Sequence, residues 1–143
     1  MKNVFLLLIC VIFGCTFLGC SYPRHEGKEV EYAEKVFVVN TVDNQKKLQE
    51  YLKYHKNIWP EVEGGFKKAG FKSISLYRFN DLIVMRVTFP KGADLNKMSQ
   101  LSESFSPRCA EWNKLMNAYQ KGVNGTSPGQ KWVEVIPFYK FSN

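Results

Sequence analysis

The sequence predicts an α+β domain in which helices cover one face of an antiparallel sheet. Apolar and polar residues alternate over 73–78 and 82–89, as they do in half-buried strands. Apolar side chains recur at helical spacing after the first strand and again after the second pair of strands. The resulting order, strand, helix, two strands, helix and strand, is typical of folds that segregate their helices to one side of the sheet.

The first half of the domain is predicted as one strand followed by a bent helical stretch. Residues 35–40 (KVFVVN) are β-branched, aromatic or apolar, which indicates a strand. Residues 41–44 turn the chain and supply a cap for a helix over 45–54. Pro60 suits only the first position of a helix, so a second helical piece begins there and closes at Gly70.

The second half is predicted as a hairpin, two helices and a last strand. Residues 79–81 form the hairpin turn, and Pro107 begins the second of two helices over 95–104 and 108–119. Residues 132–138 (WVEVIPF) are the final strand, with a proline that marks it as an edge. The order βαββαβ is ferredoxin-like, and two copies that pack sheet to sheet would form a dimeric α+β barrel.

Composition indicates one globular domain without a metal or nucleic-acid site. In 143 residues, 45% are hydrophobic and 15% aromatic, which suffices for a core. The net charge is +7, the lysines of the predicted helices fall on outer helix faces, and no arginine–aromatic pattern indicates nucleic-acid binding. The domain itself holds one histidine and one unpaired cysteine, Cys109, too few ligands for a metal. We therefore expect no metal, no cofactor and no nucleic-acid partner.

The N-terminus has the pattern of an export signal. Residues 1–19 join a short positive start to an apolar run that is brief for spanning a bilayer. The FLGC tetrad resembles a bacterial lipoprotein box, so we expect lipidated Cys20 as the first mature residue; Cys15 is a weaker alternative. Residues 20–34 would be a tether and 35–143 the domain. The expected location is the membrane, anchored by lipid and facing the periplasm.

One histidine lies where proton-transfer chemistry could occur. An i, i+4 spacing places Tyr51 and His55 on one helix face, just before the bend that Pro60 completes. A titratable ring at a bend, among aromatic side chains, suits a general acid or base. Taken alone, such a histidine is more often structural, and Trp59 is best explained as an anchor of the bend.

Residues 35–141 resemble the L-rhamnose mutarotase family. The resemblance lies in EYLKYHKNIWPEVE, residues 50–63, and in the CAEW segment that ends at Trp112. Family membership implies ferredoxin-like homodimers that interconvert the α and β anomers of a free sugar without a cofactor. It also implies that His55 is the proton donor, and that Tyr51 and Trp112 bind the substrate.

The sequence departs from the family at two pocket positions. Ile74 stands in place of a second binding tyrosine, while Tyr77 matches another aromatic position. Asn113 replaces the second residue of a Trp-Trp pair. The expected substrate is therefore L-rhamnose or a related 6-deoxy or neutral hexose, with Glu61 or a sugar-held water as the complementary base.

The expected chemistry needs one group that both gives and takes a proton. Histidine, with an ordinary pKa of about 6.5, does either near neutrality, and a helix C-terminus would favour its charged form. Two other functions stay open: a non-catalytic sugar-binding lipoprotein, and a cofactor-free monooxygenase, which rests on shared fold alone.

Overall fold

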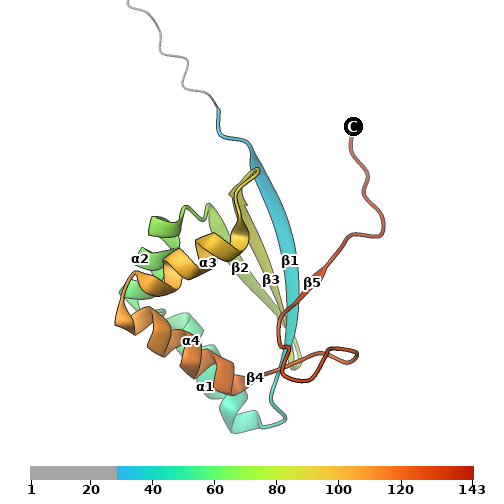
Figure 1. The fold of residues 1–143 in the computed structure, drawn as a ribbon. Helices are drawn as coiled ribbons and strands as arrows, with labels where there is room; N and C mark the ends of the chain where they lie inside the picture. Colours follow the sequence, from blue (N-terminus) through green and yellow to red (C-terminus); the bar gives the residue numbers. More distant parts are fainter. Residues whose placement is uncertain (1–28) are drawn as a thin grey trace, which may run out of the picture.

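The computed structural model describes residues 29–143 (Figure 1). The predicted signal and Cys20 lie outside these residues. Within residues 29–143, no helix has both the length and the apolar character needed to cross a membrane. The elements are β1 (Tyr32–Thr41), α1 (Gln45–Lys56), α2 (Pro60–Ala69), β2 (Ser73–Phe79), β3 (Leu82–Pro90), α3 (Leu95–Ser104), α4 (Pro107–Tyr119), β4 (Gln120–Lys121) and β5 (Val133–Val135).

The strands form one antiparallel sheet in the order β2-β3-β1-β4, with β5 also paired to β1. The central strand β1 therefore has the hairpin β2–β3 on one side and the chain's last strands on the other. All four helices lie on one side of this sheet (Figure 1). The predicted ferredoxin-like α+β fold is confirmed.

Alternation along the strands separates a covered face from an open one. Val39 and its partner Ile83 point toward the helices and are almost fully buried. Their neighbours Val38 and Val84 pair with each other on the opposite face, where they are only half-buried. The core therefore lies between sheet and helices.

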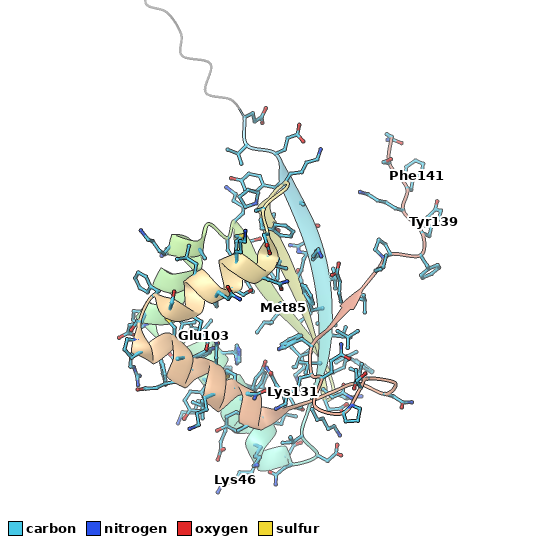
Figure 2. The ribbon with its side chains drawn as sticks, in the orientation of Figure 1. Lys46, Met85, Glu103, Lys131, Tyr139 and Phe141 are labelled. Atoms are coloured by element: carbon cyan, nitrogen blue, oxygen red, sulfur yellow. The ribbon has the colours of Figure 1, made fainter. Side chains whose placement is uncertain are left out.

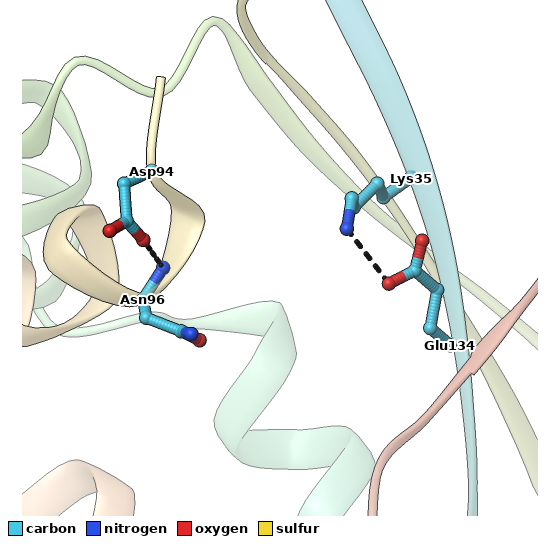
Figure 3. Close-up of polar contacts among 4 residues, drawn as sticks. All are labelled: Lys35, Asp94, Asn96 and Glu134. Carbon is cyan, nitrogen blue, oxygen red and sulfur yellow. Dashed lines mark hydrogen bonds and ion pairs between the residues drawn. The ribbon is translucent and has the colours of Figure 1, made fainter. Parts of the chain in front are cut away.

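The helix ends follow the chemistry that the sequence predicts. Asn44 and Asp94 cap α1 and α3 by accepting backbone N–H groups; the Asp94 Oδ1 to Asn96 N distance is 2.9 Å (Figure 3). Pro60 occupies the first turn of α2, and Gly70 ends that helix at φ 87°, where a side chain would be strained. These signals fix the break between α1 and α2, and with it the position of the candidate histidine.

The last strand is shorter than predicted. Instead of 132–138, β5 spans Val133–Val135, and Pro137 without its N–H cannot continue the ladder. An ion pair of 2.8 Å between Lys35 and Glu134 holds β5 against β1 (Figure 3). Residues 136–143 leave the sheet.

Two other boundaries also differ from the sequence-based expectation. β1 begins at Tyr32, inside the predicted tether. The two-residue strand β4 was not predicted; it forms because Thr41 of β1 pairs with Gln120, a contact that no local pattern reveals.

Candidate functional site

A cleft of about 1050 Å³ lies between the helices and the covered face of the sheet. His55 stands in the last turn of α1 at the place where the chain breaks before α2. The sheet side of the cleft is apolar, whereas α3 and α4 present mainly polar groups. The residues of interest that line it are Phe37, Ile74 and Met85 from the sheet, Asn113 and Asn117 from α4, and Tyr51, His55, Trp112, Gln120 and Trp132. Figure 2 shows Met85 pointing from the sheet toward the helices.

The hydrogen bond of His55 fixes its tautomer. Its Nδ1 lies 2.9 Å from the backbone carbonyl oxygen of Tyr51. A carbonyl only accepts, so Nδ1 carries the hydrogen and Nε2 of the neutral ring keeps a free lone pair. This arrangement leaves Nε2 as a proton acceptor in the resting state.

Burial favours the uncharged form of the His55 ring. The ring is half-buried, and desolvation lowers its pKa below the ordinary value of 6.5, although the bond to the Tyr51 carbonyl opposes this. The helix C-terminus was expected to favour the charged form; the Tyr51 carbonyl does favour it, but desolvation is the larger cause, so the pKa of His55 is lowered on balance. The partial charge at a helix end is worth less here than the solvation that the ring loses.

An aromatic cluster positions the imidazole. The His55 ring centroid lies 4.2 Å from that of Tyr51 and 5.4 Å from that of Trp112, which also packs edge-on against Trp59 at 5.3 Å. Tyr51 is 1% exposed and Trp112 is 5% exposed, so each offers the cleft only a small surface. Their main contribution is to hold His55, the most accessible member of the three, at the cleft wall.

Gln120 was not among the predicted site residues. Its Nε2 donates to the Tyr51 hydroxyl at 3.4 Å, and both side chains are buried. Burial raises the pKa of Tyr51, with the Gln120 bond opposing, so the phenol stays protonated. Because the Tyr51 hydroxyl oxygen accepts a hydrogen bond from Gln120, the Tyr51 hydroxyl proton remains available to another acceptor. Only its position directly after α4 marks this glutamine in the sequence.

Of the other predicted residues, two line the cleft and one does not. Ile74 and Asn113 stand on opposite walls, on β2 and α4. Tyr77, three residues after Ile74, points to the open face of the sheet, as its pairing with Val84 shows. Of these three residues, Ile74 and Asn113 line the same cleft as His55, and Tyr77 does not.

The remaining two predicted residues lie beside the cleft. Trp59 packs between Trp112 and the Arg108 guanidinium, whose carbon lies 3.6 Å from the Trp59 ring centroid. The backbone carbonyl of Glu61 accepts from the Cys109 thiol at 3.3 Å, which ties α2 to α4. Neither side chain lines the cleft in the described part of the chain.

Trp132 is a cleft residue that sequence reasoning placed elsewhere. We expected it in the final strand, 132–138, but it precedes β5 and lines the cleft. The neighbouring Lys131, labelled in Figure 2, donates to the Asn117 backbone carbonyl near the end of α4. This hydrogen bond connects the segment before β5 to α4. The sequence pattern placed Trp132 in the final strand, but that strand begins one residue later, at Val133.

The comparison with known families decides the family to which the chain belongs. A sequence model of the L-rhamnose mutarotase family matches residues 34–141. The chain belongs to this family. It is a sugar mutarotase, an isomerase of free sugars, and the predicted resemblance is confirmed.

Two relatives are similar to this mutarotase in sequence. The chain is 30% identical over 109 residues to the L-fucose mutarotase of Xanthomonas campestris, covering 74% of this chain and 86% of that one. It is 26% identical over 104 residues to a UPF0734 protein of Dictyostelium discoideum, covering 70% and 80%.

Two solved structures are similar in shape. A dimeric ferredoxin-like protein from an uncultured marine organism gives a TM-score of 0.48 at 13% identity, covering 80% of this chain and 95% of that one. Tetracenomycin F2 cyclase from Streptomyces glaucescens gives 0.47 at 14% identity, covering 78% and 98%.

Proposed function

We propose that this mutarotase interconverts the anomers of a neutral 6-deoxyhexose, L-rhamnose or a close relative, with His55 as the catalytic base and acid. One observation carries the assignment: the His55 ring lines a cleft large enough for a sugar, and its Nδ1 is held by the Tyr51 carbonyl, so that Nε2 of the neutral ring is free to accept a proton. The L-fucose mutarotase relative acts on another 6-deoxyhexose, which supports this substrate class.

A single nitrogen can carry the whole proton transfer. Nε2 takes the proton of the anomeric hydroxyl, and the C1–O5 bond breaks as O1 forms the aldehyde carbonyl. The departing O5 then takes the proton back from the imidazolium. Both oxygens are bonded to C1, so both lie within reach of one ring nitrogen. Rotation about the C1–C2 bond and closure by the reverse steps give the other anomer.

The cleft walls fit an amphipathic sugar. Ile74, Met85 and Phe37 form an apolar surface that suits the C–H face and methyl group of a 6-deoxyhexose. Asn113 and Asn117 on the opposite wall can hydrogen-bond its hydroxyl groups. Replacement of Ile74 by Tyr would add a hydroxyl to the apolar wall, so this position is expected to affect which sugar is preferred.

Magnetisation-transfer NMR between the two anomeric proton signals tests the proposal directly. We expect the purified protein to accelerate exchange of L-rhamnose or L-fucose, and His55→Gln to abolish the acceleration. The matched control is His25→Gln, which removes the chain's other histidine. Absence of acceleration on a panel of aldoses would refute the enzymatic proposal. If calorimetry then showed sugar binding, the protein would be a non-catalytic sugar-binding lipoprotein instead.

We further propose that the protein is exported and anchored through lipidated Cys20. The support is the sequence pattern of residues 1–19 and the FLGC tetrad that ends at this cysteine. Metabolic labelling with a radioactive fatty acid should mark the wild type and Cys15→Ser, but not Cys20→Ser. Label that depends on Cys15, or no label at all, would contradict the assignment.

A further inference from the structure

The cleft is much larger than the single sugar assigned to it. Even at about 30 Å³ per non-hydrogen atom, the volume that one molecule takes in liquid water, a 6-deoxyhexose needs only about 330 Å³. The cleft measures about 1050 Å³. A single sugar at His55 therefore fills less than half of it.

The cleft is also elongated along the direction of the strands. Gln120 and Val87 both line it. Gln120 pairs with Thr41 of β1, and Val87 pairs with Lys35 of the same strand. These two β1 positions are six residues apart, which corresponds to about 20 Å. A cleft of this length can receive several sugar units in a row.

His55 lies near the Gln120 end of the cleft. Its ring centroid is 4.2 Å from that of Tyr51, whose hydroxyl accepts from Gln120. The two ends also belong to separate apolar clusters, because Tyr51 packs in one, and Val87 packs with Met98 of α3 in the other. The length beyond a single sugar therefore runs from His55 toward Val87 and α3. We call this part the far end.

The far end has the same two-sided character as the rest of the cleft. Its floor is apolar, because the sheet continues from Met85 to Val87, two residues further along β3. Opposite this floor, α3 contributes Asn96, Ser99 and Glu103, whose spacing of three and four residues places them on one helix face. Met85 and Glu103 lie on opposite sides of this space in Figure 2.

The polar groups on this face of α3 suit the hydroxyl groups of a sugar. All three side chains are exposed, and within residues 29–143 the side-chain hydrogen bonds at α3 come from Asp94 and Ser104 instead. An amide, a hydroxyl and a carboxylate together offer both donors and acceptors. An acyl chain would suit the floor but would leave these groups without partners. The charged residues that line the cleft, two glutamates and three lysines, nearly balance, which favours a neutral ligand.

We infer that the far end binds the remainder of a neutral oligosaccharide whose reducing-end 6-deoxyhexose lies at His55. This inference rests on the function proposed above, and it extends the substrate class from a free monosaccharide to the reducing end of a longer chain. Ring opening at C1 needs only a free O1 hydroxyl. The next unit can therefore be joined through O2, O3 or O4 and lie along the cleft, and the glycosidic bond stays intact.

Calorimetry with the full chain compares L-rhamnose with the neutral L-rhamnobioses joined through O2, O3 and O4. We expect at least one disaccharide to bind about tenfold more tightly than L-rhamnose, because the second unit adds contacts of its own. Ser99→Trp fills the far end, and this variant should bind the disaccharide no more tightly than L-rhamnose. The matched control is Gln100→Trp, at the next residue of α3 and outside the cleft lining, which should keep the preference.

Equal affinity for L-rhamnose and all three disaccharides would overturn the inference, as would a preference that survives in Ser99→Trp. Magnetisation-transfer NMR on the same sugars separates this result from the proposed function. If L-rhamnose exchanges faster with the protein but no disaccharide gains in affinity or in kcat/KM, the catalytic proposal stands and the far end is not a sugar site. If a disaccharide binds more tightly but no sugar exchanges faster, the far end binds sugar and the catalytic proposal fails.

Discussion

The state of His55 predicts how anomer exchange depends on pH. Only the neutral ring has a free lone pair on Nε2, so protonation removes the catalyst. Even at the ordinary pKa of 6.5, about three-quarters of the rings would be neutral at pH 7. Burial lowers the pKa of His55, so the neutral fraction at pH 7 is higher still. We expect kcat/KM to be flat near neutrality and to fall about tenfold per pH unit below a midpoint that lies under 6.5.

Magnetisation-transfer rates from about pH 5 to about pH 8 measure this profile. Spontaneous mutarotation also responds to pH, so rates with His55→Gln are subtracted at each point. A midpoint at or above 6.5 would refute the reasoning, as would a rate that rises on acidification. Either result would mean that His55 acts first as a proton donor.

The same shift in pKa predicts a loss of stability in acid. As pH falls below 6.5, the unfolded chain binds a proton on His55 before the folded protein does, so the free energy of unfolding decreases. His55→Gln lacks this linkage and should lose less stability between neutral and mildly acid pH. Urea titrations at both pH values compare the two proteins; an equal loss in both would contradict the assigned shift.

Two substitutions test the contacts around the cleft. Gln120→Leu takes the hydrogen-bond donor from the buried Tyr51 hydroxyl; the bond is long, 3.4 Å, so we expect a loss of about 1 kcal/mol, seen as a lower urea midpoint. An unchanged midpoint would show that the bond contributes nothing. Gly65→Ala would bring a Cβ within 2.6 Å of the Ser102 backbone oxygen, forcing α2 and α3 apart at a cost of about 1–3 kcal/mol. Its control is Gly64→Ala, whose Cβ meets only a movable side chain; thermal unfolding should separate the two, and equal effects would contradict the packing described for α2.

Local chemistry made much of the fold predictable. Pro60 and Gly70 bound α2 in the sequence as in the structure, and the spacing of Tyr51 and His55 places both rings on one helix face with centroids 4.2 Å apart. Prolines, glycines and helical periodicity act within one or two turns, so they can be read without knowledge of the partner elements.

What could not be predicted depends on tertiary contacts. The register of β2 against β3 puts Ile74 in the cleft and Tyr77 on the open face, although both were candidates. Gln120 enters the site only because β4 pairs with β1. The charge of His55 follows from how much water the fold removes from the ring, whereas the sequence shows only the helix end and suggests the opposite.

The most direct test of the account is a long-range ¹H–¹⁵N NMR spectrum of His55 with and without a sugar that the protein turns over. We predict a protonated Nδ1 and an acceptor-type Nε2 at neutral pH, with the Nε2 signal shifting when the sugar binds. A protonated Nε2 in the free protein, or a His55 ring whose signals ignore the bound sugar, would contradict the proposal that this nitrogen receives the anomeric proton.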